Sequence, residues 1–447
     1  MYVCGATVQS PPHLGHVRFA INFDLLRRWL LRQGYAVRYV RNVTDVEDKV
    51  MAKATEAGLP WWELAYANER AFSRAYDLLG CLPVTYEPRA TGHIPQIISL
   101  IQRLIDRGAA YPSAGDVLFD VGSFAAYGEL SGQRPDEVQA AEDSENPAVK
   151  RDSRDFVLWK AAKPGEPSWQ TPWGAGRPGW HIECSAMAVE YLGSTFDIHG
   201  GGVDLVFPHH ENEIAQAVAA GDEFARYWMH NAWVTMAGEK MSKSLGNTAL
   251  VSVIAERYRP VELRFYLASP HYRSTVEYST TSLDEAAAAY RRLESFVLHA
   301  REQLGAERAE AALAAELPDK FVAAMNDDLS VPQALAVVYN TVREGNSALA
   351  AGEYSEVLAH LSEVRAMLDV LGLDPLDPQW RETSSSGRER ALTGALDSLI
   401  GGLLEQREQA RAAKDWASAD AIRDRIRDAG VEVTDGPDGP RWSVSGR

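Results

Sequence analysis

Residues 1–45, MYVCGATVQSPPHLGHVRFAINFDLLRRWLLRQGYAVRYVRNVTD, decide the fold. A short apolar run ends at Gly5, a turn containing Pro11 and Pro12 follows, and apolar residues then recur at helical spacing until Gly34. The next run, YAVRYVRNVTD, is typical of a second strand. Strand, helix and strand within this length predict a βαβ unit. Such a unit implies an α/β fold with a doubly wound parallel sheet, whose ligands bind at the carboxyl ends of the strands.

Downstream of this unit the sequence predicts an interrupted sheet followed by helices. Helical patterns continue to about residue 110. Residues 111–150 show little periodicity and are interpreted as a connective insertion, whereas short apolar runs between Gly-rich turns indicate that the sheet resumes between 151 and 250. Beyond about residue 280, Ala, Leu, Glu and Arg at helical spacing predict a helical bundle.

The C-terminal part predicts a small α+β tail domain. The stretch 374–390, rich in Pro, Ser and charge, is typical of a linker. One long helix ending near Gly430 is expected after it, followed by a β-hairpin that turns at Asp438 and Gly439.

The composition is that of a globular, multidomain, cytosolic protein. A chain of 447 residues with 46% hydrophobic and 24% charged residues suggests about two to four domains. No uncharged apolar run approaches the length of about 18 residues that a membrane span needs, and the N-terminus lacks the pattern of a signal peptide. The three cysteines, Cys4, Cys81 and Cys184, are too few and too scattered for a disulfide framework. They are expected to be reduced thiols, packing residues or metal ligands.

The net charge of −17 argues against a nucleic-acid partner, because polyanions bind to basic surfaces. A binding groove needs only a local basic patch, however. Arg257, Arg259, Arg264 and Arg273 are expected to supply one. The objection stays open.

Two short motifs could bind a nucleotide. His13-Leu14-Gly15-His16 lies after a predicted strand and at the start of a predicted helix, where unpaired N–H groups and the helix dipole attract phosphate. The imidazoles would add donors, and Gly15 would let a flat ligand approach the backbone. The alternative is a turn with two surface histidines.

The second motif is Lys240-Met241-Ser242-Lys243-Ser244, between Gly238 and Gly246. Its two ammonium groups could close over a triphosphate and neutralise a pyrophosphate leaving group. The alternative is a solvated surface loop. Both motifs in this order, one near each end of a split nucleotide fold, are far more informative than either motif alone.

HLGH and KMSKS resemble the signature sequences of class I aminoacyl-tRNA synthetases. Several longer stretches resemble cysteinyl-tRNA synthetases in particular: YVCGATV, RNVTDVEDKV, EPRATGHI, GWHIECSAMA, FDIHGGGVDLVFPHHENEIAQ and GEKMSKSLGN. The resemblance implies a Rossmann-like catalytic domain that activates cysteine with ATP and Mg²⁺ and transfers it to tRNA(Cys), in a monomeric protein. It implies ATP-binding residues His13, Gly15, His16, Lys240, Ser242 and Lys243, of which His13, His16, Lys240 and Lys243 are expected to be catalytic.

The resemblance also implies a division into domains. Residues 1–250 are expected to form the catalytic domain, with the insertion at about 111–150. Residues 251–300 would contact the tRNA stem, 301–380 would form a helical tRNA-binding bundle, and 391–447 would form the anticodon-binding domain.

Four residues are candidate metal ligands. His209 and Glu213 lie four apart and so share one helix face, while Cys4 and Cys184 are distant in sequence. From spacing alone, inert buried thiols and a surface His–Glu pair are the commoner interpretation. The family resemblance implies that these four bind one Zn²⁺ ion that recognises the substrate thiol; His210 is adjacent, so the choice of histidine rests on the resemblance. Zinc binds a thiolate far better than a serine hydroxyl, which would make an editing domain unnecessary.

Four further residues are assigned by the resemblance. Trp180 resembles the tryptophan that walls the cysteine pocket, and core packing is the alternative. Trp416, Asp435 and Trp442 resemble positions near an anticodon-reading surface, where unstacked bases are bound. The alternative is an ordinary amphipathic packing helix.

Two rival functions are considered. A cysteine ligase of the mycothiol pathway, which joins activated cysteine to an amino-sugar, resembles the same catalytic domain but lacks the C-terminal extension. A catalytically silent RNA-binding paralogue would not need intact motifs and zinc positions. One departure concerns the start: the family normally carries a short segment before the YVCG-like strand, so the sequence suggests a truncation or a misassigned start. An uncovered first strand is then expected to fray and loosen Cys4.

Overall fold

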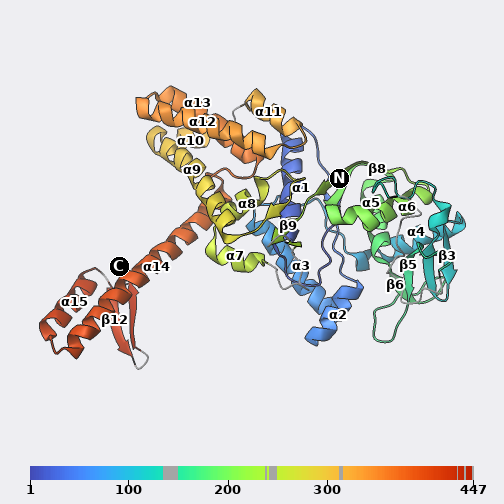
Figure 1. Ribbon diagram of the computed structural model, residues 1–447, viewed down its shortest axis with the longest axis horizontal. Coiled ribbons are helices and arrows are strands. Elements are labelled where there is room, and N and C mark those ends of the chain that lie inside the picture. The colour runs from blue at the N-terminus through green and yellow to red at the C-terminus, as the bar shows by residue number, and fades with distance from the viewer. Residues whose placement is uncertain are drawn as a thin grey trace. The chain divides into compact units, whose positions relative to one another are not determined.

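The computed structural model describes residues 1–133, 150–236, 239–240, 249–311, 316–429, 431–436 and 439–444 (Figure 1). The chain forms two compact units, Met1–Asp377 and Pro378–Arg447, and each is described by itself.

A parallel sheet organises the first unit. Its strands are β1 (Tyr2–Val3), β2 (Val40–Arg41), β7 (Thr195–Gly202) and β8 (Phe224–Asn231), in the order β2-β1-β7-β8, and all three neighbouring pairs are parallel. Helix α1 (Leu14–Arg32) connects β1 to β2, which confirms the predicted βαβ unit. The helix packs closely on the sheet: a Cβ atom on Gly200 would lie 2.4 Å from the ring of Phe23. The strand order reverses between β1 and β7, which is where a doubly wound sheet binds its ligands.

The first strand lies inside this sheet. β1 pairs with β2 on one side and with β7 on the other, and Tyr2, Val3 and Cys4 are buried. The backbone N–H of Cys4 donates to the carbonyl of Gly200 at 3.0 Å. The expectation of an uncovered, fraying first strand is therefore wrong, because both edges of β1 are hydrogen-bonded.

A second, antiparallel sheet lies between the two halves of the parallel one in sequence. It consists of β3 (Ala110–Ser113), β4 (Asp116–Phe119), β5 (Phe156–Ala161) and β6 (Gly176–Pro178), in that order. The expectation that the first sheet resumes between 151 and 250 is confirmed by β7 and β8, but β5 and β6, in the first part of that range, belong to this second sheet. An apolar run does not reveal its pairing partner, because buried parallel and antiparallel strands have similar patterns.

Helices and short strands complete the first unit. The predicted helical bundle is confirmed, because α9 (Thr280–Leu304), α12 (Val331–Ala351) and α13 (Tyr354–Val370) pack on one another (Figure 1). The other α-helices and strands are α2 (Asp48–Ala57), α3 (Trp61–Leu78), α4 (Ile94–Asp106), α5 (Trp180–Leu192), α6 (Glu211–Ala219), β9 (Val234–Met236), β10 (Glu239–Lys240), α7 (Val251–Arg257), α8 (Pro260–Ala268), β11 (Val276–Glu277), α10 (Ala306–Ala311) and α11 (Asp319–Asn326).

The second unit contains α14 (Pro378–Ala412), α15 (Trp416–Asp428), β12 (Val431–Gly436) and β13 (Gly439–Val444). The predicted hairpin is confirmed, with Gly436 opposite Gly439, while Asp438 lies outside the described residues. The predicted linker is wrong, because α14 includes most of it. Pro378 is the first residue of that helix, where a missing N–H costs nothing.

The single long helix expected before Gly430 is also wrong. The helix is interrupted between α14 and α15 at Lys414, which has a φ of 60°. The Asp415 carboxylate then caps the start of α15, because it accepts a hydrogen bond from the N–H of Ser418 at 3.1 Å. Among the described helices, none combines the length and the apolar character needed to cross a membrane.

Candidate functional site

The HLGH motif forms the N-terminus of α1. His13 is the N-cap: its Nδ1 accepts a hydrogen bond from the N–H of Gly15 at 3.1 Å, and Nδ1 of His16 accepts one from the N–H of His13 at 3.2 Å. The two imidazoles stack with their centroids 3.7 Å apart. A Cβ atom on Gly15 would lie 3.0 Å from the His13 ring, so glycine lets this ring fold back over the helix start. The motif therefore presents two stacked imidazoles at the positive end of a helix.

The backbone next to the second motif pairs with the first motif. The N–H of Leu14 donates to the carbonyl of Ala249 at 3.0 Å, and the N–H of Val251 donates to the carbonyl of Pro12 at 3.2 Å. Lys240 lies in β10, which pairs with β9, but its side chain is not among those that the structure describes. Ser242 and Lys243 lie outside the described residues. The two motifs are thus joined through the chain that follows residue 248.

A cleft of about 290 Å³ lies at the carboxyl ends of the parallel strands. His13, Gly15 and His16 line it on one side, and Cys4 and Trp180 line it on another. Lys49, Asp204 and Trp233 also line the cleft and were not singled out from the sequence, although Lys49 and Asp204 lie in stretches that resemble the family. The Nζ of Lys49 lies 5.9 Å from the centroid of the Trp180 ring. The cleft thus connects the histidine motif to one thiol of the metal candidates.

The four candidate metal ligands converge from separate elements. Cys4 follows β1, Cys184 lies in α5, His209 lies in the π-helical turn Val206–His210, and Glu213 lies in α6. All four are buried, and one donor atom from each lies within 4.8 Å of the others. The Cys4 thiol donates to Oε1 of Glu213 at 3.2 Å, and Nε2 of His209 lies 3.1 Å from the same oxygen. Two sulfurs, one imidazole and one carboxylate are the donor types that zinc prefers.

Electrostatics divide the two thiols into a proton-bearing one and an ionised one. Burial and the neighbouring Cys184 hold the pKa of Cys4 well above its usual value. Burial acts in the same direction on Cys184, but the hydrogen bond from Cys4 and the charge of His209 bring the pKa of Cys184 below its usual value. Burial likewise opposes the protonated form of His209, yet the Glu213 carboxylate and the Cys184 thiolate raise the pKa of this imidazole to about 10.

Two further histidines contact this cluster, and they were not identified as site residues from the sequence. Nδ1 of His181 lies 2.9 Å from Nδ1 of His209, and Nε2 of His199 lies 2.8 Å from Oε2 of Glu213. His210 belongs to a different group, formed with Cys4, His199 and Glu213. Only the group with His209 contains both thiols. Neither periodicity nor spacing could have identified His181 or His199, because their contacts with His209 and Glu213 depend on the tertiary structure.

Trp180 lines the cleft beside the candidate metal ligands. It is the first residue of α5, four positions before Cys184, and its ring centroid lies 4.4 Å from that of His209. The ring therefore borders both the cleft and His209, and it is not an isolated core residue.

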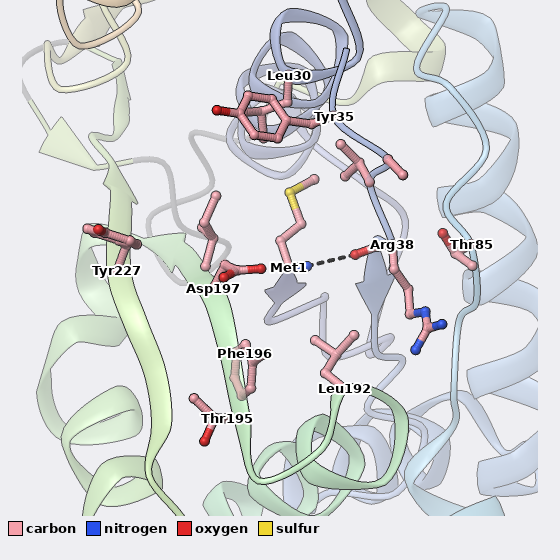
Figure 2. A pocket seen from close by; sticks show the side chains of 13 residues that line it. Met1, Leu30, Tyr35, Arg38, Thr85, Leu192, Thr195, Phe196, Asp197 and Tyr227 are labelled. Atoms are coloured by element: carbon pink, nitrogen blue, oxygen red, sulfur yellow. Dashed lines mark hydrogen bonds between the residues drawn. The ribbon is translucent and has the colours of Figure 1, made fainter. Parts of the chain in front are cut away.

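A larger cavity of about 750 Å³ lies at the amino ends of the parallel strands (Figure 2). Its lining includes Met1, Arg38 and Thr195, which lie at or just before the starts of strands, and the amino group of Met1 donates to the carbonyl of Arg38 at 2.7 Å. The described residues of the two motifs and of the metal cluster are absent from its walls. This cavity is therefore separate from the candidate site, since doubly wound sheets bind ligands at the carboxyl ends of their strands.

The basic patch expected from four arginines is wrong. Arg264 is fully buried and pairs with Asp24 at 2.6 Å. The other three are exposed or partly exposed and face carboxylates: Arg257 faces Asp284, Arg259 pairs with Glu262 and Glu294, and Arg273 pairs with Asp328. Except for Glu262, the acidic partners lie 27 or more positions along the chain, so a local count of arginines overestimates the surface charge.

The three tail residues lie in separate elements of the second unit. Trp416 begins α15 and is exposed. Asp435 lies in β12 opposite Pro440, and Trp442 lies in β13 opposite Val433. The side chains of these two strand residues are outside the description.

Comparison with known proteins covers almost the whole chain. Residues 1–288 match the model of the tRNA synthetases class I (C) catalytic domain, residues 320–375 match the DALR domain, and residues 393–442 match the cysteinyl-tRNA ligase anticodon binding domain. The chain is 58% identical over 447 residues to a cysteine–tRNA ligase of Streptomyces avermitilis, covering 100% of this chain and 95% of the relative. It is 60% identical over 448 residues to a cysteine–tRNA ligase of Streptomyces coelicolor, covering 100% and 72%.

Solved structures share the fold at low identity. Mycobacterium tuberculosis methionyl-tRNA synthetase in complex with methionyl-adenylate superimposes with a TM-score of 0.61 at 17% identity, covering 84% of this chain and 91% of that one. A LeuRS–tRNA–LeuAMS ternary complex from Agrobacterium radiobacter gives 0.61 at 12% identity, covering 86% and 85%. Both matches confirm the predicted architecture.

Proposed function

The chain belongs to the cysteine–tRNA ligase family of class I aminoacyl-tRNA synthetases, and from this premise we propose how its residues activate cysteine and pass it to tRNA. The observation that carries the proposal is the cleft that joins the HLGH histidines to Cys4 and Trp180. An adenylate-forming enzyme must hold a nucleotide and an amino acid side by side, and this cleft offers a place for each.

We infer that Cys4, Cys184, His209 and Glu213 hold one zinc ion. The donor set fits this ion, since all four are buried and within 4.8 Å of one another, and the group with His209 offers both thiols whereas the group with His210 offers one. A bound zinc ion would supply a soft Lewis acid that the substrate thiolate can join as a ligand and a serine hydroxyl cannot. His181 and His199 support the site by holding His209 and Glu213 in place.

Zinc uptake near pH 7.5 is expected to release about two protons, because only deprotonated groups ligate the ion. At this pH the metal-free protein keeps a proton on Cys4, whose pKa is raised, and one on His209, whose pKa is about 10. Cys184 and Glu213 are already ionised, since their pKa values are lowered. Because protons leave on binding, zinc affinity must rise with pH between about 6 and 8. Calorimetric titration in buffers of different ionisation enthalpy measures the proton count, and a count of zero would contradict this assignment.

We propose that the nucleotide lies against the start of α1. Backbone N–H groups and the helix dipole favour its phosphates, and His13, His16, Lys240 and Lys243, with Mg²⁺, offset the charge that develops at phosphorus. A carboxylate oxygen of cysteine attacks the α-phosphorus of ATP, and the bond to pyrophosphate breaks. Positioning and electrostatic stabilisation supply most of the rate, because this step needs no covalent enzyme intermediate.

The second step takes place in the same cleft. The terminal 2′-hydroxyl of tRNA attacks the carbonyl carbon of the adenylate, the bond to the phosphate oxygen breaks, and AMP leaves. Trp180 closes the amino-acid side of the cleft, and Trp416, Asp435 and Trp442 are proposed to face the anticodon. Both motifs and all four metal donors come from one chain, so we infer that a monomer is sufficient.

Cysteine-dependent exchange of pyrophosphate into ATP is the direct test of activation. The zinc-loaded protein is expected to exchange label with cysteine and not with serine, because the two amino acids differ only in the ligand atom. Charging of a tRNA(Cys) transcript then tests transfer. Absence of exchange in a folded, zinc-loaded sample would contradict the mechanism.

The amino-sugar ligase is the second candidate and is disfavoured. Residues 393–442 match an anticodon binding domain, which a ligase for a small sugar does not need. Transfer of cysteine to an amino-sugar in preference to tRNA would reverse this choice.

A further inference from the structure

Arg18 is a buried cation on the helix that carries the HLGH motif. It lies two residues after His16, and its side chain is inaccessible to solvent. Its guanidinium donates to four main-chain carbonyl oxygens, at 2.9 Å for Ala232, 2.6 Å for Trp233 and 3.3 Å for His271, with Ser274 as the fourth acceptor. One side chain thus holds two separate stretches of backbone.

Burying the Arg18 guanidinium lowers the stability of the fold, which suggests that its hydrogen bonds serve the function of the protein. Among the described residues no carboxylate pairs with Arg18, and burial lowers its pKa to about 10. A buried charge without a counter-ion lowers stability, and an apolar side chain of similar volume would fill the same space more favourably. Only a guanidinium, with five donors in a fixed plane, can reach four carbonyls at once.

The four carbonyls mark both ends of one segment. Ala232 and Trp233 precede β9, while His271 and Ser274 precede β11. These two strands pair, with Val276 opposite Val234, and the N–H of Ala232 donates to the carbonyl of Tyr272 at 2.8 Å. The segment between them, residues 232–276, contains the whole KMSKS motif.

The same segment is attached to the HLGH motif at a second place. The carbonyls and N–H groups of residues 249–251 pair with those of residues 12–14, just after the second motif. The backbone on both sides of residues 241–248 is therefore attached to the start of α1, on one side through Arg18 and on the other through main-chain hydrogen bonds. Ala232 and Trp233 also line the cleft.

We propose that Arg18 is a positioning residue that fixes the ends of the 232–276 segment against the helix that carries His13 and His16. The described backbone that leads into the KMSKS motif and the backbone that follows it are then both held beside the histidines that the proposed nucleotide contacts. The inference rests on the proposed ATP-dependent activation. It assigns Arg18 an effect on the rate of activation, separate from any effect on cysteine binding, because the printed partners of its guanidinium are carbonyls of residues 232, 233, 271 and 274, none of them a candidate metal ligand.

The test compares Arg18→Met and Arg18→Lys with Arg365→Met as a matched control. Arg365 in α13 is also buried; it pairs with Asp374 at 2.7 Å and donates to the carbonyl of Glu310 at 3.2 Å, away from the cleft. Pyrophosphate exchange gives kcat and the KM values for ATP and cysteine, alongside zinc content and Tm. Arg18→Met is expected to lower kcat by about 10²-fold, the scale of a displacement of about 1 Å, with the KM for cysteine and the zinc content unchanged. Arg18→Lys is expected to lie between Arg18→Met and the wild type.

Arg365→Met is expected to lower Tm and leave kcat unchanged. The proposal fails if Arg18→Met keeps the wild-type kcat below its Tm, if Arg365→Met loses kcat equally, or if neither Arg18 variant folds. A wild-type protein without cysteine-dependent exchange would instead overturn the proposed function itself, and that failure is recognised before any variant is made.

Discussion

Replacing Cys184 with serine is expected to remove the bound metal and to lower kcat/KM for cysteine by about 10³-fold, equivalent to about 4 kcal/mol of transition-state stabilisation. The side chain is buried, and its thiol is the one whose pKa the surroundings lower. A serine hydroxyl has nearly the same shape but is a poor zinc ligand, so the fold should persist while the donor set loses one of its two sulfurs. Elemental analysis and pyrophosphate exchange with cysteine and with serine measure both effects.

Cys81→Ser is the matched control for this substitution. Cys81 is partly buried and belongs to neither described metal group, so its variant should keep full metal and activity. If Cys184→Ser retained one zinc ion per chain, or discriminated against serine as strongly as the wild type, the proposed metal set would be wrong.

Replacing His13 with asparagine is expected to lower kcat for pyrophosphate exchange by about 10²- to 10³-fold, the usual effect of removing one donor to a charged transition state. Asparagine is a favourable N-cap, so it can still accept the hydrogen bond that Nδ1 of His13 accepts from Gly15. The substitution therefore removes the imidazole from the cleft and keeps the start of α1.

His13→Ala supplies the comparison, because alanine removes both the ring and the cap. It should lose a similar amount of activity and about 1 kcal/mol more stability than His13→Asn. Thermal unfolding and exchange kinetics separate the two contributions. Normal exchange by His13→Asn would mean that the ring serves only as a cap.

Local patterns predicted the elements that position the nucleotide motif. The apolar spacing predicted α1 from Val17 onward, three residues after its observed start at Leu14, and Gly34 follows its end closely, so the end could be read directly. The same reasoning failed for β5 and β6, because a strand's own residues do not state which sheet it joins. It failed again between α14 and α15, where a single residue in a left-handed conformation, Lys414, interrupts a continuous helical pattern.

Some features of the candidate site could be predicted from local sequence, and others could not. The spacing of His209 and Glu213 is local and could be interpreted physically, whereas the convergence of Cys4 and Cys184 depends on a sheet whose strands are far apart in sequence. Only the family resemblance suggested it. His181 and His199 lie within stretches that resemble the family, but their spacing gave no signal, and neither did that of Arg18, because their partners are defined by tertiary contacts.

The buried four-donor cluster has a consequence for how the protein is made. Cys4 and Glu213 are 209 positions apart, so at about 5–20 residues per second the ribosome adds the last donor roughly 10–40 s after the first. During that interval the nascent chain carries an incomplete set of donors while the entire antiparallel sheet is synthesised. Because 234 residues follow Glu213 in the 447-residue chain, the proposed metal site can be completed before translation ends, but not before the antiparallel sheet has been made.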